Sequence, residues 1–148
     1  MKDYADPRMH SAEHILNQTM DRMFGCGRCF TSHIEKKKSK CDYHFDRPLT
    51  GQEIREIEKR VNEVIQADMQ VTEEFVYREE AEGPYDMDRL PEAADRIRIV
   101  KIGDYDACPC IGPHVRSTEE IGEFRIASAS FDNDVLRIRF KLAEAEKQ

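Results

Sequence analysis

Residues 6–25 read DPRMHSAEHILNQTMDRMFG and predict the first helix of the chain. Asp6 is suited to the N-cap, where its carboxylate accepts hydrogen bonds from free backbone N–H groups, and Pro7 is suited to the first helical position. Apolar residues recur on one side of a 3.6-residue period, at Met9, Leu16, Met20 and Met23. A glycine turn at 25–27 ends the pattern. We therefore expect a helix with one apolar face, followed by a turn.

A second helix is predicted from Thr50 to about Ala67. Thr50 and Glu53 have the spacing of a capping box, in which each side chain accepts a hydrogen bond from the backbone N–H of the other residue. Isoleucines and valines then follow at helical spacing. Six other segments have the composition or the alternation of strands, and they are residues 30–35, 41–45, 71–77, 96–102, 124–129 and 135–142.

These elements predict an α+β fold. We expect two main helices packed on a mostly antiparallel sheet of about six strands, in a single domain that covers residues 1–148. Residues 79–94 contain Gly83, Pro84 and Pro91, which interrupt regular structure. We expect a loop there that holds one short turn of helix.

The composition and the distribution of apolar residues exclude several classes of protein. The 148 residues carry a net charge of -7, with 36% charged and 39% hydrophobic residues. The chain has no apolar run long enough for a transmembrane helix, and its first ten residues have no apolar block typical of a secretory signal. We therefore expect no membrane partner and a cytoplasmic location. An acidic total also disfavours binding nucleic acid over a broad phosphate footprint.

One short segment is strongly basic, although the chain as a whole is acidic. Four lysines, Lys36, Lys37, Lys38 and Lys40, form a dense basic turn. Such a turn is suited to contacting a phosphate backbone, and it is equally suited to being an ordinary solvated turn.

Two residue pairs have the spacing of metal ligands. His10 and His14 lie four residues apart on the first helix, so their side chains lie on one face. Cys110 and His114 form a C-x-x-x-H pair in a loop shaped by prolines and a glycine. Together the pairs offer three imidazoles and one thiolate, a set that favours tetrahedral Zn²⁺. Spacing alone does not show that the pairs meet, and exposed histidines are the alternative.

The remaining cysteines offer a competing site. Five cysteines are an odd number without a secretory signal, which favours thiols or metal ligands over disulfides. Cys26 and Cys29 form a C-x-x-C in the glycine turn, and Cys108 with Cys110 would complete a four-cysteine site. Alternatively, these thiols bind nothing. Cys41 lies on a strand and is expected to be a small buried residue.

Several motifs resemble those of one family, and they occur along the chain in the same order as in that family. Residues 10–17, HSAEHILN, resemble the H-x-x-x-H helix of the alanyl-tRNA synthetase editing domain, and residues 110–115, CIGPHV, resemble its C-G-G-T-H-V motif. Further similar segments are 43–46, 54–65, 102–105 and 120–126. The resemblance covers about residues 8–142, and it is closest to the freestanding short form, the trans-acting alanyl-tRNA editing proteins. Threonyl-tRNA synthetases carry a related domain.

The resemblance implies a zinc-dependent hydrolase. Its substrate would be mischarged alanine tRNA carrying serine or glycine, held at the acceptor end of the tRNA. The implied zinc ligands, matched position by position, are His10, His14, Cys110 and His114. On this interpretation Cys26, Cys29 and Cys108 lie outside the site.

Two segments depart from the family pattern. Ile111, Gly112 and Pro113 stand where the family has G-G-T, so this loop is expected to alter the substrate pocket. The first hairpin is also unusual. Ser32, His33 and Glu35 are candidates for facing the pocket, with an ordinary strand surface as the alternative, and the lysine turn would guide the acceptor stem. The alternative function is a non-catalytic, zinc-stabilised module, derived from the editing domain, that binds tRNA or a protein.

Overall fold

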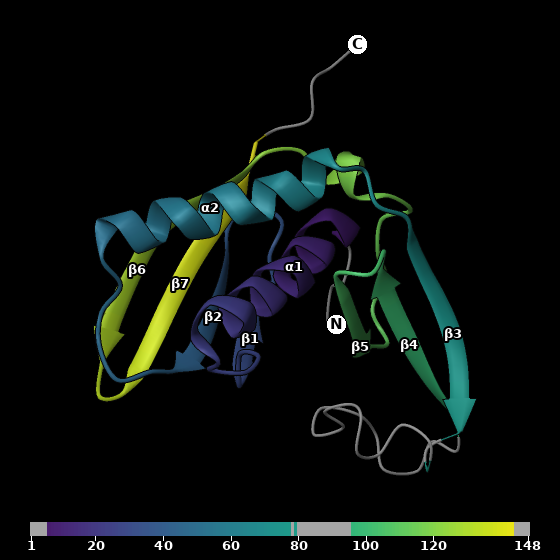
Figure 1. Cartoon of the computed structure of the whole chain (residues 1–148), viewed down its shortest axis with the longest axis horizontal. Coiled ribbons are helices and arrows are strands. Elements are labelled where there is room, and N and C mark those ends of the chain that lie inside the picture. The colour runs from purple at the N-terminus through teal and green to yellow at the C-terminus, as the bar shows by residue number, and fades with distance from the viewer. Residues whose placement is uncertain (1–5, 78, 80–95, 144–148) are drawn as a thin grey trace.

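The computed structural model describes residues 6–77, 79 and 96–143. Its two helices are α1 (Pro7–Phe24) and α2 (Gly51–Gln66), and a short 3₁₀ helix, η1, covers Thr118–Ile121. The strands are β1 (Thr31–His33), β2 (Ser39–His44), β3 (Val71–Tyr77), β4 (Arg96–Ile102), β5 (Asp106–Pro109), β6 (Phe124–Asp132) and β7 (Val135–Leu142). Figure 1 shows α1 crossing the middle of the molecule, with strands on both sides.

The strands form two antiparallel sheets. One sheet has the order β1-β2-β7-β6 and the other has the order β3-β4-β5. The two helices, the antiparallel pairing and the six expected strands are confirmed, but the expectation of one sheet is wrong. Alternation of apolar and polar residues identifies a strand but does not identify its neighbours, so the sequence did not reveal the division. The predicted loop at 79–94 lies outside the described residues, except for Glu79.

The seventh strand, β5, was not expected, and it lies directly before the Cys110–His114 segment. It pairs with β4 from Ile102↔Asp106 to Ile99↔Pro109. Its four residues, Asp-Ala-Cys-Pro, have no hydrophobic alternation, and proline is disfavoured within strands. Pro109 is tolerated because it ends the strand. This hairpin places Cys110 directly after the edge of the three-stranded sheet.

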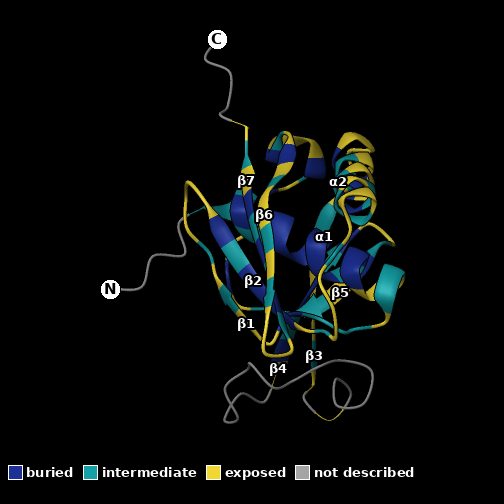
Figure 2. Cartoon of the chain, turned by 90° about the vertical axis from the view of Figure 1, so that its left-hand side faces the viewer, coloured by how far each residue is buried: buried dark blue, intermediate teal, exposed yellow. Residues whose placement is uncertain are grey.

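The first helix is buried on more than one face. Asp6 caps it as expected, because Oδ1 accepts hydrogen bonds from the backbone N–H groups of Arg8 (3.0 Å) and Met9 (3.3 Å). Gly25 ends it with φ at 65°, which favours glycine. The buried residues include Glu13, His14 and Asn17 as well as the apolar face. The buried surface is therefore wider than a single apolar stripe, and Figure 2 shows this burial along α1.

The second helix closes the core over the four-stranded sheet. Its capping box is present, with hydrogen bonds between Thr50 and Glu53 in both directions. The Asn62 amide bonds both the N–H and the C=O of Phe124, which ties α2 to the start of β6. None of the helices in the described ranges is long and apolar enough to cross a membrane.

Thr118 fixes the end of α2 from the inside. It is fully buried, and its hydroxyl donates toward the carbonyls of Val64 (2.9 Å) and Ile65 (3.2 Å) while accepting from the N–H of Met69 (2.8 Å). The last carbonyls of a helix have no intrahelical partner, so a buried hydroxyl here replaces the missing hydrogen bonds.

We expect Thr118→Val to lower the free energy of unfolding by about 1–3 kcal/mol, because it leaves buried carbonyl and N–H groups unpaired while keeping the side-chain shape. Urea unfolding measures this loss. The matched control is Thr72→Val on the exposed face of β3, where we expect a change within about 0.5 kcal/mol. Equal losses in both variants would contradict this role of Thr118.

Candidate metal centre

Four side chains from two distant parts of the chain meet in one cluster. His10 and His14 come from α1, and Cys110 and His114 come from the loop after β5. One ligand atom of each residue lies within 4.8 Å of the corresponding atoms of the other three. The His10 ring stacks on the His114 ring at a centroid distance of 4.2 Å, and Cys110 Sγ lies 3.2 Å from His10 Nε2. The structure thus brings together the two pairs singled out by their spacing.

The loop that carries Cys110 and His114 is held from both sides. From β4, the Arg98 guanidinium donates hydrogen bonds to the carbonyls of Cys110 (3.2 Å) and Gly112 (2.8 Å). From α1, the Ser11 hydroxyl accepts a hydrogen bond from the N–H of Val115 (3.2 Å). These contacts fix the loop backbone against the helix that carries the other two histidines.

Each histidine has one ring nitrogen next to a fixed polar group. His10 Nδ1 lies 3.1 Å from the carbonyl oxygen of Pro113, which can only accept a hydrogen bond. His114 Nδ1 lies 2.9 Å from Ser11 Oγ, and His14 Nδ1 lies 3.5 Å from Asp106 Oδ2. Partners of this kind orient histidine ligands in metal sites and select their tautomer.

The donor set fits a metal ion. Among the described residues, the buried side-chain N and O atoms without a hydrogen-bond partner are His14 Nδ1 and His114 Nε2. Buried polar atoms are nearly always paired, and His114 already uses its other nitrogen with Ser11. A cation bound at Nε2 would satisfy the unpaired atom. Three imidazoles and one thiolate could therefore hold one divalent metal, with the tetrahedral ligand number and types that zinc prefers.

The pKa values of Cys110 and His114 favour the protonation states that bind a cation. Burial raises the pKa of the Cys110 thiol, but the interactions of the thiolate with the imidazoles of His10, His114 and His14 outweigh burial and lower that pKa to about 3. Burial lowers the pKa of His114 to about 4. Cys110 is therefore a thiolate and His114 a neutral imidazole at pH 7, which are the forms that bind metals.

His14 carries the opposite charge when no metal is bound. Burial lowers its pKa, but the interactions with the Asp106 carboxylate and with Cys110 outweigh burial and raise that pKa to about 9. An imidazolium then faces the Cys110 thiolate. A metal ion would take over this positive charge, and His14 would release its proton.

Asp106 anchors His14 from behind. Its carboxylate accepts hydrogen bonds from Arg28 Nη1 (2.8 Å) and Gln18 Nε2 (2.9 Å). Burial raises the pKa of Asp106, and the interactions with His14 and Arg28 outweigh burial and hold that pKa well below its usual range. Sequence reasoning missed Asp106, Arg28 and Arg98, because their partners are set by the packing of β5 and β4 against α1.

Gly112 is required by the close approach of His10. A Cβ atom at this position would lie 2.2 Å from His10 Cε1 and 2.6 Å from His10 Nδ1. Its neighbours in the altered loop differ, because Ile111 is 67% exposed and Pro113 is also exposed. The loop therefore presents Ile111 and Pro113 to solvent beside the cluster.

The residues of the first hairpin lie outside the four-residue cluster. His33 Nε2 pairs with Glu35 Oε2 at 2.5 Å, and both side chains are more than half exposed. Ser32 is half-buried on β1, Lys36, Lys37 and Lys38 are exposed, and Lys40 is half-buried at the start of β2. Within this turn, buried Ser39 contacts Met9, the residue before His10, at an Oγ–Sδ distance of 3.5 Å. The lysine turn therefore adjoins the start of α1.

The four-cysteine alternative does not assemble. The described residues contain two groups of three or more metal-binding side chains, and neither combines Cys26 and Cys29 with Cys108 and Cys110. Burial raises the pKa of Cys108 to about 12, which disfavours the thiolate. Cys41 is fully buried, as expected.

The fold and the cluster define a small α+β domain with a candidate metal centre of three histidines and one cysteine. Residues 97–138 match the family model described as the threonyl and alanyl tRNA synthetase second additional domain. The resemblance expected from the motifs is confirmed: the chain is similar in sequence to alanine–tRNA ligases over most of its own length.

Three relatives show the extent of the similarity. The alanine–tRNA ligase of Aeropyrum pernix is 34% identical over 143 residues, which cover 93% of this chain and 16% of the ligase. The ligase of Treponema denticola is 34% identical and covers 88% and 22%, and that of Fervidobacterium nodosum is 36% identical and covers 83% and 14%. The chain therefore spans less than a quarter of the length of these relatives.

We expect Gly112→Ala to weaken binding of Zn²⁺ by about 10–100-fold without unfolding the chain, because the added methyl group displaces the His10 ring. Competition with a zinc chelator measures the affinity. Gly51→Ala is the matched control, since its Cβ meets only Arg55 Nη1, at an ordinary 3.5 Å. Unchanged affinity in Gly112→Ala would show that the cluster tolerates a moved His10.

We expect Asp106→Asn to destabilise the metal-free chain by about 1.5–3 kcal/mol at pH 7, because it removes the buried carboxylate that accepts hydrogen bonds from half-buried Arg28. Because the pKa of Asp106 is lowered in the folded chain, its contribution to stability is fully present above the usual carboxyl range and is lost as the pH falls below that range toward the lowered pKa. The difference from wild type should therefore shrink in acid. Urea unfolding at several pH values tests this, with exposed Asp104→Asn as the control.

Proposed function

We propose that this chain is a zinc-dependent hydrolase that deacylates mischarged aminoacyl-tRNA, with serine or glycine on alanine tRNA as its substrates. The observation that carries the proposal is the cluster of His10, His14, Cys110 and His114, four ligand types suited to zinc within 4.8 Å of one another. The relationship to alanine–tRNA ligases supports a charged tRNA as the partner.

The proposed reaction is hydrolysis of the ester between the amino acid and the terminal ribose of the tRNA. Zinc, when bound by the four side chains, supplies a Lewis acid that polarises a carbonyl or lowers the pKa of water. Two side chains and one backbone group orient the ligands: Asp106 holds His14, Ser11 holds His114, and the Pro113 carbonyl holds His10. These contacts keep the ligands in place during the reaction.

The surface beside the cluster would select the amino acid. Ile111 and Pro113 are exposed next to the ligands, so they are the side chains available to contact a bound amino acid. Serine and glycine differ from alanine by very few atoms, so a site that attaches alanine to tRNA discriminates poorly against them. The general solution is a second site that hydrolyses the wrongly charged tRNA. Ser32, His33 and Glu35 remain candidates for contacting substrate from the first hairpin.

The lysine turn is the proposed contact for the acceptor end. Lys36, Lys37 and Lys38 are exposed, and Lys40 lies beside Ser39, which contacts the start of α1. Phosphates approaching the cluster from this side would meet positive charge, whereas the net charge of the chain is -7. We therefore propose that tRNA binds with modest, salt-sensitive affinity, in the cytoplasm.

The decisive experiment measures deacylation of serine-charged alanine tRNA by the zinc-loaded chain. We expect release of serine well above the uncatalysed rate, with a loss to background in His114→Ala and after removal of zinc by a chelator. Cys108→Ser is the matched control, because Cys108 lies two residues from Cys110 but outside the cluster, and we expect it to keep its activity.

Two results distinguish the alternatives. Full hydrolysis by the metal-free chain would contradict the proposed mechanism. A chain that binds zinc and tRNA but releases neither serine nor glycine would instead be the non-catalytic, zinc-stabilised module, and the exposed Ile111 and Pro113 would be the first positions to restore toward the family pattern.

A further inference from the structure

The interior of the domain contains a second group of metal-binding side chains. Glu13 of α1, Cys29 of the loop before β1 and Cys41 of β2 each offer one ligand atom, and these atoms lie within 4.8 Å of one another. All three residues are buried. The group shares no residue with the four-residue cluster, and the function proposed above does not use it.

The backbone around this group is firmly held. Asn17 Oδ1 accepts hydrogen bonds from the N–H of Cys29 (3.1 Å) and from the hydroxyl of Tyr43 (2.8 Å). Cys41 lies on β2, between its partners Ser32 on β1 and Ile138 on β7. The loop, the helix and the strand that carry the three side chains are therefore fixed relative to one another, as a preformed metal site requires.

The measured spacing agrees with a shared metal ion. Cys29 Sγ lies 3.5 Å from Glu13 Oε2. Zinc binds sulfur at about 2.3 Å and carboxylate oxygen at about 2.0 Å, and in a tetrahedral site these lengths place the two donors about 3.5 Å apart. We propose that Glu13, Cys29 and Cys41 bind a second Zn²⁺ ion. Two thiolates and one carboxylate favour zinc over Mg²⁺ or Ca²⁺, which prefer oxygen ligands alone.

Glu13 lies between the two metal centres. Its Oε2 faces Cys29, and its Oε1 lies 3.8 Å from His10 Nε2, the nitrogen that also approaches Cys110. This position follows from the sequence, since Glu13 comes three residues after His10 and one before His14 on the same helix. The carboxylate therefore couples the interior group to the first cluster.

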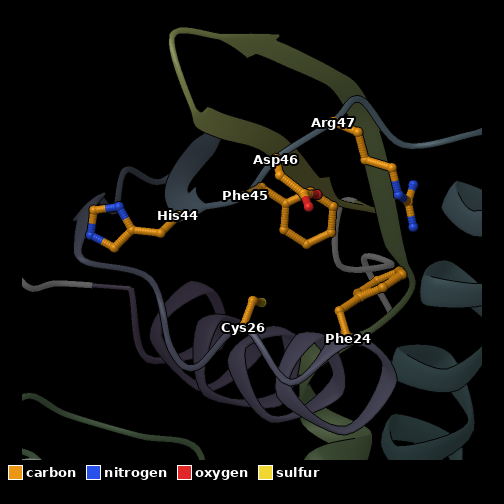
Figure 3. Close-up of a pocket in the computed structure, with 6 residues that line it drawn as sticks. All are labelled: Phe24, Cys26, His44, Phe45, Asp46 and Arg47. Atoms are coloured by element: carbon orange, nitrogen blue, oxygen red, sulfur yellow. The ribbon is translucent and has the colours of Figure 1, made fainter.

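A surface pocket is lined in part by the segment that carries Cys29. Figure 3 shows the pocket, lined by Phe24, Cys26, His44, Phe45, Asp46 and Arg47, with a volume of about 520 Å³. Cys26 lines this space and lies three residues before Cys29 in the C-x-x-C segment. The Cys26 thiol and the His44 imidazole are of the ligand types that zinc prefers, so this surface also offers zinc-binding groups near the C-x-x-C segment.

The test counts zinc ions in the full chain. The protein is stripped of metal with a chelator under reducing conditions, loaded with Zn²⁺, desalted and analysed by mass spectrometry for zinc per chain. We expect two zinc ions in wild type and one in the Cys29→Ser, Cys41→Ser double variant. Cys26→Ser, Cys108→Ser is the matched control with two other thiols removed, and we expect it to retain two.

Cobalt locates the second ion independently of the first. In a variant with Cys26, Cys108 and Cys110 all replaced by Ser, the remaining thiols are Cys29 and Cys41. We expect Co²⁺ to give a thiolate-to-cobalt absorption band in this variant, and Glu13→Gln, which keeps the shape of the side chain, to weaken Co²⁺ binding there by at least tenfold. Circular dichroism checks that each variant folds, and Glu13→Gln replaces the double variant in the zinc count if that variant does not.

Two results would overturn the second site. One is a single zinc ion per wild-type chain that is lost in Cys110→Ser, which would mean that the interior group binds no metal and that the Cys29 thiol only donates a hydrogen bond to Glu13. The other is two zinc ions retained in the Cys29→Ser, Cys41→Ser variant. Neither result depends on whether the chain hydrolyses aminoacyl-tRNA, so this proposal and the proposed function are tested separately.

Discussion

The buried carboxylate of Asp106 is the interaction on which the candidate metal centre depends. It lies on β5 and accepts hydrogen bonds from Gln18 on α1 and from Arg28 in the loop after α1, while its second oxygen faces His14. An uncompensated charge in this position would be costly, so the carboxylate requires all of these partners together. Asp106 therefore holds the three-stranded sheet against the first helix at the point where the ligands meet.

This arrangement explains why the first helix buries so many polar side chains. A helix at the edge of a domain exposes its polar face to water, but α1 contacts other elements on several faces and carries buried Glu13, His14 and Asn17. Each of these side chains has an assigned contact, with Cys29, Asp106 and Tyr43 respectively. The polar interior is therefore organised into connected clusters, and Glu13 lies where two of them approach each other.

The sequence predicted the local features well because local physics decides them. Asp6, Gly25 and Thr50 are caps whose partners lie within a few residues, and β3, β4 and β7 have the predicted bounds. The His10 and His14 pair could be found because residues four apart share a helix face. The same rule applies to Glu13, and its position in H-x-x-E-H was the signal that could have drawn attention to it.

The features that the sequence did not predict depend on contacts between distant segments. β5 has no hydrophobic alternation and is a strand only because β4 pairs with it. Arg28 lies in the C-x-x-C segment, yet its partner is Asp106, 78 residues away. Cys29 and Cys41 come from a loop and a central strand, so their proximity follows from the hairpin and from its packing on α1.

The loop of Ile111, Gly112 and Pro113 has two roles: it positions the His10 ring, and it forms the exposed surface beside the cluster. Gly112, which the chain shares with the family pattern, lies where any Cβ atom would collide with His10. Pro113 replaces the threonine of that pattern, but its contact with His10 uses the backbone carbonyl, which every residue provides. Ile111 replaces a glycine at an exposed position. Neither substitution removes a contact that orients a ligand, and both alter the exposed surface beside the cluster. If the proposed function holds, this loop therefore affects the choice of substrate more than the binding of metal.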